Sequence, residues 1–133
     1  MDSKKLKDSA DFEIFRWMIK YIWSLKDHQL RELNVSRLSH ELNMSRSYLY
    51  DLFKTYKINS PGWLLKRIRI IRASELLLEK PRLSVKKVST KIGFNTVDYF
   101  IRVFKDYFGT TPLKYRRYYQ EERPGGAVDI PGV

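Results

Sequence analysis

Apolar residues recur every three or four positions through most of the chain, and no strand-like alternation of useful length appears. Residues 9–26 predict a first amphipathic helix with apolar positions at Phe12, Phe15, Ile19, Ile22 and Trp23. After a polar connection, Ser36 is placed to cap a short helix that Asn43 interrupts, and Ser45 to cap a second helix. The apolar positions of this pair are Leu38, Leu42, Leu49, Leu52, Phe53 and Tyr56. This stretch therefore predicts a helix, a short turn and a helix.

A longer uninterrupted helical pattern comes next. Asn59 and Ser60 before Pro61 are typical of a helix start, and Pro81 stops the pattern after Glu79. The apolar positions of this predicted helix are Leu64, Ile68, Ile71 and Leu76. The spacing thus predicts one long helix in the middle of the chain.

The signals of the first pair then return. Ser84 is placed to cap a short helix, Gly93 supplies a turn, and Asn95 or Thr96 opens the next helix. The apolar positions of this second pair are Val88, Ile92, Phe100, Val103 and Phe104. The second half therefore predicts another helix, turn and helix.

The two pairs correspond residue by residue, at an offset of 50 before the turn and 51 after it. The corresponding residues are Leu38 and Val88, Ser39 and Ser89, Leu42 and Ile92, Tyr48 and Tyr99, Leu49 and Phe100, Phe53 and Phe104, Lys54 and Lys105, and Tyr56 and Tyr107. Gly109 and Pro112 then end the second copy and begin a last helix that runs to about Tyr119. The chain is thus predicted to repeat one supersecondary unit.

These signals predict an all-α fold of about seven helices, with two helix-turn-helix subdomains joined by a long central helix. We expect the first subdomain over residues 9–59, the linker helix over 60–80 and the second subdomain over 81–120. Residues 121–133 are rich in glycine and proline and lack periodicity, so we expect them to be disordered.

Composition excludes several classes of function. The 133 residues include no cysteine, which excludes disulfide frameworks, cysteine zinc sites and thiol nucleophiles. Only His28 and His40 remain as soft metal ligands, and neither a glycine-rich phosphate loop nor a serine elbow is present. No apolar run approaches the roughly eighteen residues of a membrane span. We therefore expect no catalytic activity, cofactor, metal or membrane partner, and a cytoplasmic location.

Positive charge is concentrated in the middle of the chain. The net charge is +11, and residues 35–120 alone carry 18 basic and 6 acidic side chains. A cationic surface on a folded region, rather than on an arm, favours an anionic partner, most often nucleic acid. Helix-turn-helix units on such a chain favour double-stranded DNA, with the second helix of each unit in the major groove.

A longer motif in the second half makes the assignment more specific. It consists of Gly93-Phe94, Tyr99-Phe100, Arg102, Phe104-Lys105, Gly109, Thr111-Pro112 and Tyr115-Arg116. In spacing it resembles the signature of the AraC/XylS-type transcription regulators, over roughly residues 10–120. The resemblance implies that two recognition helices enter successive major grooves. It also implies a bacterial, nucleoid-associated regulator, of a family that mostly activates transcription by touching RNA polymerase. Independently, the 19-residue linker helix is about 28 Å long, close to the roughly 34 Å of one DNA turn.

Candidate DNA-binding residues lie outside the core positions of the two second helices. In the first unit they are Arg46, Ser47, Tyr50, Asp51 and Lys54; in the second they are Asn95, Thr96, Val97, Asp98, Ile101, Arg102 and Lys105. Arg46 and Arg102 suit a guanine edge, and Asp51 suits the amino group of cytosine. Val97 and Ile101 suit contact with a thymine methyl group. The lysines suit phosphates, as do the starts of the short helices, where we name Ser36, Ser84 and Lys86.

Several of these residues have a plainer structural interpretation. Asp98, Arg102 and Asp106 are spaced four apart, which is also the pattern of an intrahelical ion-pair ladder. Asp51 corresponds to Arg102 in the repeat, so its carboxylate either accepts from a base or repels phosphate. Tyr48 and Tyr99 are expected to pack, with their hydroxyls exposed. The basic residues of the linker helix are expected to form a solvated face; they are Lys66, Arg67, Arg69 and Arg72.

The first unit departs from the family pattern. Ile58 stands where glycine commonly follows the recognition helix, and a β-branched residue resists the left-handed conformation. We therefore expect the first unit to dock differently. Asn43 replaces glycine in the first turn and tolerates that conformation. Ser39 and Ser89 replace the usual alanine and are small enough for close helix packing.

The sequence thus predicts a sequence-specific regulator of transcription that binds double-stranded DNA as a monomer and without a cofactor. Two other classes stay open. One is a protein-interaction module with vestigial DNA binding, and the other is a basic RNA-binding protein.

Overall fold

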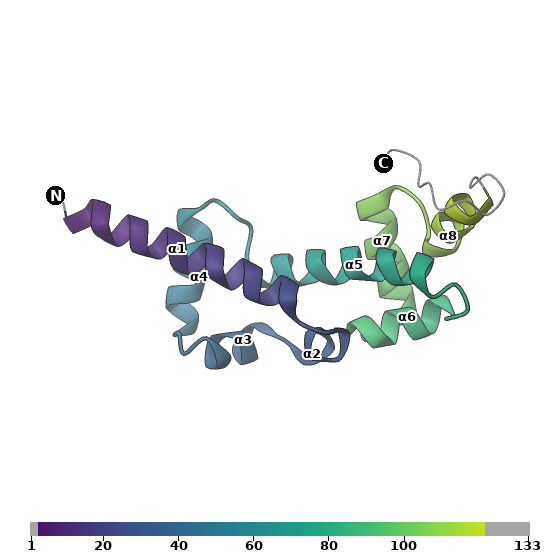
Figure 1. The fold of residues 1–133 in the computed structure, drawn as a ribbon, viewed down its shortest axis with the longest axis horizontal. Coiled ribbons are helices and arrows are strands. Elements are labelled where there is room, and N and C mark those ends of the chain that lie inside the picture. The colour runs from purple at the N-terminus through teal and green to yellow at the C-terminus, as the bar shows by residue number, and fades with distance from the viewer. Residues whose placement is uncertain (1–2, 122–133) are drawn as a thin grey trace. The chain divides into compact units, whose positions relative to one another are not determined.

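The computed structural model describes residues 3–121, and every regular element in that range is an α-helix (Figure 1). The helices are α1 (Ser3–Ser24), α2 (Asp27–Glu32), α3 (Val35–Glu41), α4 (Arg46–Thr55), α5 (Pro61–Glu79), α6 (Val85–Ile92), α7 (Val97–Phe108) and α8 (Pro112–Glu121). The all-α fold is confirmed, with eight helices in the described range instead of about seven. Of the tail that was expected to be disordered, Glu121 ends α8 and the remainder lies outside the described residues.

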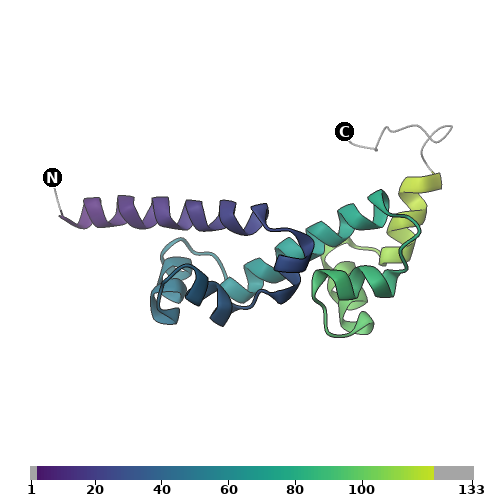
Figure 2. The same ribbon diagram turned by 60° about the horizontal axis from the view of Figure 1, so that its bottom comes forward.

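The chain divides into two compact units, residues 1–68 and residues 69–133, and the division falls within α5. Each unit contains one helix-turn-helix pair, α3 with α4 and α6 with α7, whose members lie side by side (Figure 1, Figure 2). Each also has its own apolar core. In the described range, no helix has both the length and the apolar character needed to cross a membrane.

The core of the first unit buries one side of α1, at Phe15, Met18 and Ile22. The periodicity had also placed Phe12 and Trp23 inside, and this was wrong because they are 49% and 40% exposed. The inward face instead continues to Leu25, just beyond the end of the helix. The other members of this core are Leu30, Leu33, Leu38, Leu49, Leu52, Phe53, Leu64, Leu65 and Ile68.

The connection expected to be merely polar contains the additional helix α2. Leu30, its one buried residue, is fully enclosed in the core. The helix begins where the Lys26 N–H donates to the side-chain oxygen of Gln29 at 2.9 Å. A six-residue helix with a single apolar position shows no periodicity, which is why the pattern did not reveal it.

Helix α3 begins earlier than expected. The residue that caps it is Asn34, whose side chain accepts from the Arg37 N–H at 2.8 Å, whereas Ser36 lies inside the helix. The cap at Ser45 is confirmed by its hydrogen bond from the Tyr48 N–H. Asn43 adopts a φ of 53°, so the expected left-handed turn residue is also confirmed.

The second unit agrees closely with its predicted signals. Ser84 caps α6 and Thr96 caps α7, each accepting from the N–H three residues later. Gly93 has a φ of 104° and forms the turn. The core contains Ile70, Ala73, Leu76, Leu77, Val88, Ile92, Phe94, Phe100 and Phe104, while Ile71 and Val103 are only partly buried against it.

The end of α4 differs from the expectation for Ile58. The left-handed residue is Lys57, at a φ of 55°, and Ile58 comes directly after it with its N–H donating to the Phe53 carbonyl at 2.9 Å. The Lys57 N–H donates to the Lys54 carbonyl, so this end is a Schellman motif with an apolar residue after the left-handed position. Ile58 packs against the core in that role. Gly109, at a φ of 77°, is therefore the conformational counterpart of Lys57.

Arg116 of α8 closes the end of α5 within the second unit. It is 8% exposed, and its Nε and Nη2 donate to the carbonyls of Leu77 at 2.9 Å and Lys80 at 3.3 Å. Burial lowers the pKa of its guanidinium. The last carbonyls of a helix have no partner within the helix, and the Arg116 side chain supplies a donor to one of them, that of Leu77. The Lys80 carbonyl, just beyond the helix, also accepts from the Leu83 N–H at 3.0 Å.

Candidate nucleic-acid interface

A small buried serine lies in the first helix of each helix-turn-helix pair, and its carbonyl accepts from the residue that follows the turn. Ser39 and Ser89 are 7% and 1% exposed, which confirms that these positions serve close packing. The Ser39 hydroxyl donates to the Met44 carbonyl at 2.5 Å, and the Met44 N–H returns a bond to the Ser39 carbonyl. In the second unit the Phe94 N–H donates to the Ser89 carbonyl at 3.0 Å. The turn before each candidate recognition helix is therefore fixed by the helix that precedes it.

Helix α4 presents all of its candidate residues on its outer face. Arg46, Ser47, Tyr50, Asp51 and Lys54 are exposed, while Leu49, Leu52 and Phe53 are buried. The exposed face thus carries a cation toward each end and a carboxylate between them. This surface has hydrogen-bond donors and acceptors of the kind that read base edges.

Helix α7 presents its candidates less uniformly. Asn95, Thr96, Asp98, Arg102 and Lys105 are exposed. Val97 and Ile101 are partly buried, and Ile101 packs against the core. The apolar pair predicted for a thymine methyl therefore presents only part of its surface.

Arg102 lies against an aromatic ring. Its guanidinium carbon is 5.3 Å from the centroid of the Tyr99 ring. Within the described residues, no ion pair joins Arg102 to Asp98 or Asp106. The intrahelical ion-pair ladder that the spacing allowed is therefore not formed. The donors of this guanidinium are not committed to a carboxylate of its own helix.

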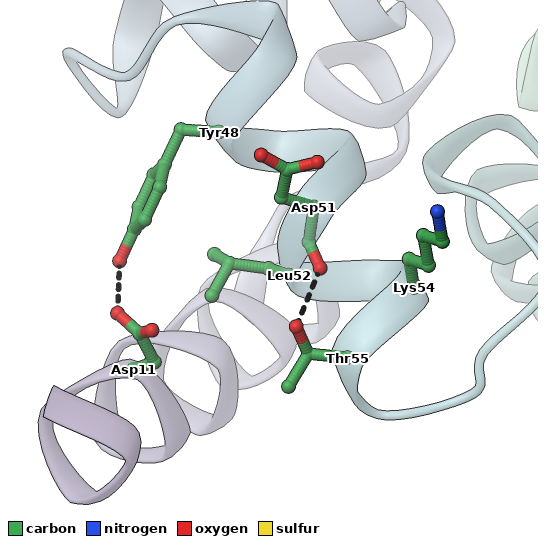
Figure 3. A pocket seen from close by; sticks show the side chains of 6 residues that line it. All are labelled: Asp11, Tyr48, Asp51, Leu52, Lys54 and Thr55. Carbon is green, nitrogen blue, oxygen red and sulfur yellow. Dashed lines mark hydrogen bonds between the residues drawn. The ribbon is translucent and has the colours of Figure 1, made fainter. Parts of the chain in front are cut away.

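The corresponding tyrosine of the first unit has a different environment. The Tyr48 hydroxyl donates to Asp11 of α1 at 2.6 Å, a partner that the expectation of a packed ring with an exposed hydroxyl did not include (Figure 3). The bond, together with burial, raises the pKa of Tyr48 to about 12. A shallow cavity of about 290 Å³ opens beside it, and Asp51, Lys54 and Thr55 contribute to its lining (Figure 3).

The basic residues of α5 do not form a freely solvated face. Arg67 is exposed, and its guanidinium carbon lies 5.2 Å from the Trp63 ring centroid. Lys66, Arg69 and Arg72 are partly buried, and burial lowers the pKa of Arg69. The expectation failed because α5 itself contributes many buried residues, among them Leu65, Ile68 and Leu77, so little of the helix is left as a freely solvated face.

The residues named for phosphate contacts lie at or near the starts of short helices. Ser36, Ser84 and Lys86 are all exposed. The Ser84 hydroxyl is already an acceptor for the Lys87 N–H, which leaves its own proton available to an anion.

Comparisons with known proteins decide the family. A family model described as a helix-turn-helix domain matches residues 38–118, more than half of the chain. A solved transcriptional regulator from Chromobacterium violaceum, with an AraC-type DNA-binding domain, is similar at a TM-score of 0.67 and 25% identity. That similarity covers 83% of this chain and 96% of the other. The chain belongs to the AraC-type helix-turn-helix family. The resemblance drawn from the second-half motif is thereby confirmed.

Two curated relatives of this AraC-type chain regulate operons. The Msm operon regulatory protein of Streptococcus mutans serotype c is 39% identical over 85 residues, or 64% of this chain and 30% of the relative. The raffinose operon transcriptional regulatory protein RafR of Pediococcus pentosaceus is 34% identical over 113 residues, or 85% of this chain and 38% of the relative. The chain thus spans about a third of the length of these two relatives.

Three residues of the AraC-type units escaped prediction. Asp11 carries no signal of its role, because nothing in the sequence indicates its bond to a tyrosine 37 residues away. Arg116 belongs to the quoted motif, but its spacing gives no sign of burial. Lys57 has a signal that can be recognised in retrospect: an apolar residue directly after it suits the position that follows a left-handed cap.

Proposed function

We propose that this AraC-type chain binds double-stranded DNA sequence-specifically and regulates transcription, with α4 and α7 as its two readers. The observation that carries the proposal is the pair of exposed polar helix faces, each following a tight turn that is bonded to a buried serine of the preceding helix. The charge of residues 35–120 supports the same partner, because cationic side chains near α4 and α7 neutralise phosphates.

The candidate residues divide into those that would contact base edges and those that would contact phosphates. Arg46 and Arg102 would donate to guanine edges, and Asp51 would accept from the amino group of cytosine. Lys54 and Lys105 would contact phosphates, joined by Ser36, Ser84 and Lys86 near the helix starts. The remaining candidates, Ser47, Tyr50, Asn95, Thr96, Val97, Asp98 and Ile101, would complete the two surfaces. The proposal requires no cofactor.

A single copy would occupy one asymmetric site. Helix α5 would set the spacing of the two readers, because its 19 residues span about 28 Å against roughly 34 Å for one DNA turn. Inserting two alanines between Ile68 and Arg69, where the two units divide, would rotate the second unit by about 200° and should reduce affinity toward that of one unit. A four-alanine insertion, nearly one full turn, serves as the control and should recover part of the affinity. Equal binding by parent and two-alanine variant would show that the units act independently.

The names of the relatives indicate a wider role. Control of an operon by activation, through contact between the bound chain and RNA polymerase, is the role we propose in a bacterial cytoplasm at the nucleoid. Gene expression from a reporter carrying the selected site would rise with the chain present if it activates. Falling expression would identify a repressor instead.

A salt titration of affinity tests the binding proposal and separates its alternatives. Roughly six to ten phosphate contacts predict a loss of about a thousandfold in duplex affinity between 50 and 200 mM salt. At fixed salt, a selected duplex should be bound more tightly than a scrambled duplex or the same sequence as RNA. Equal affinity for RNA would favour the RNA-binding class. Weak, sequence-independent binding would favour an interaction module.

A further inference from the structure

The ring of Tyr99 sits between the core of the second unit and the guanidinium of Arg102. Phe94, which is 9% exposed, lies 5.9 Å from Tyr99 between ring centroids and 5.1 Å from buried Phe100. The Tyr99 N–H donates to the Thr96 hydroxyl oxygen that caps α7. Both the backbone and the ring of Tyr99 are thus anchored, although the residue is 39% exposed.

Arg102 rests on this anchored ring, 5.3 Å from its centroid. An arginine stacked on an aromatic face keeps its N–H groups in the guanidinium plane and free to bond elsewhere. Pairing with Asp98 or Asp106 would have used those donors, and neither pair forms in the described part of the chain. The stacking therefore restricts the side chain without occupying its donors.

The first unit lacks this arrangement. The residue that corresponds to Tyr99 is Tyr48, whose hydroxyl is bonded to Asp11, and the residue that corresponds to Arg102 is Asp51. Asp51 thus places a carboxylate where the second unit has the cation that stacks on a tyrosine ring. The two units consequently differ in whether a tyrosine ring lies against a cation on the second helix of the pair.

We infer that Tyr99 is a positioning residue that holds the Arg102 guanidinium ready for a base edge, making α7 the pre-organised reader of the pair. The inference rests on the proposed function and extends it to a residue that need not touch DNA itself. Restricting a long side chain before binding lowers the entropy cost of ordering it at the interface. The benefit should appear as discrimination at the base pair that Arg102 reads.

The experiment uses the full chain and a duplex site selected by the parent protein. Arg102→Ala first identifies the base pair whose discrimination depends on Arg102. Tyr99→Leu, which removes the ring but keeps apolar bulk against Phe94, should then relax discrimination at that same pair by roughly two- to fivefold. Tyr99→Phe keeps the ring and should resemble the parent. Tyr107→Leu, the same change at a similarly exposed tyrosine of α7, is the matched control.

A double-mutant cycle distinguishes positioning from a merely structural role. In the Arg102→Ala background, Tyr99→Leu should relax discrimination no further. Unchanged discrimination in Tyr99→Leu, or an equal loss of affinity for every sequence, would overturn the inference. Unchanged discrimination in Arg102→Ala would overturn the reading role of Arg102, and absent duplex binding by the parent would overturn the proposed function itself.

The stacking can also be tested on the unmodified chain, without any variant. In the nuclear magnetic resonance spectrum of the free chain, the Tyr99 ring current should shift the Arg102 side-chain protons upfield. Unshifted protons would contradict the stacking and with it the inference.

Discussion

Tyr48 and Asp11 join two helices of the first unit that are far apart in sequence: the phenol of α4 donates to the carboxylate of α1 at 2.6 Å (Figure 3). Aromatic contacts continue the same junction, because the Phe15 ring lies 5.2 Å from Phe53 and 5.0 Å from Tyr56 between centroids. The position of the candidate recognition helix α4 thus depends on α1 as well as on its partner α3.

Tyr48→Phe should destabilise the first unit in a pH-dependent way. Losing one hydrogen bond to a carboxylate should lower the free energy of unfolding by about 1 kcal/mol near neutral pH. The folded-state pKa of about 12 exceeds the ordinary value of 10, so this contribution is fully present below pH 10 and is lost as the pH rises toward 12. Denaturant unfolding of parent and variant at several pH values measures the difference. Tyr50→Phe, on the exposed face of α4, is the control; the same pH profile in both variants would refute the assignment.

Lys57→Gly should stabilise the chain. A non-glycine residue in the left-handed conformation is strained, and removing that strain should raise the free energy of unfolding by about 1 kcal/mol. The control is Lys54→Gly inside α4, where glycine weakens a helix by a similar amount. Thermal melts of the two variants should therefore shift in opposite directions. A lower melting temperature for both would show that Lys57 makes contacts worth more than the strain.

Arg116→Met should destabilise the second unit by about 2 kcal/mol, because the carbonyls of Leu77 and Lys80 lose charged donors inside the structure. Arg116→Lys should recover only part of the lost stability, because an ammonium group does not reproduce the planar guanidinium that donates to both carbonyls. Circular dichroism melts report the loss of helical content in each variant. Exposed Arg117→Met should change the midpoint little, and an equal shift in both variants would indicate an effect of charge alone.

The parts of the fold predictable from sequence were those with repeated or chemically distinctive signals. Capping serines and left-handed glycines are short-range signals, and Ser45, Ser84, Gly93 and Gly109 all occupy the predicted conformations. The constant offset of the repeat was enough to locate both helix-turn-helix units. Such features depend on neighbours within a few residues, which is the range that a pattern covers.

Features that depend on long-range packing were not predictable. Whether Phe12 or Met18 faced the core depended on which side of α1 the other helices cover, and both are apolar. The same limit applies to the site. The exposure of Arg102 was predictable from the period of α7, whereas its stacking on Tyr99 depends on side-chain rotamers and on the support from Phe94.

Selection of duplexes from a random library most directly tests whether α4 and α7 both read DNA. We predict enrichment of one asymmetric site with two informative segments about one helical turn apart, roughly 10 to 10.5 base pairs between centres. In a parallel selection, Arg102→Ala should lose information in one segment only, while the other persists. A selection that enriches no sequence, or one whose enriched site is unaffected by changes on both α4 and α7, would contradict this mode of binding.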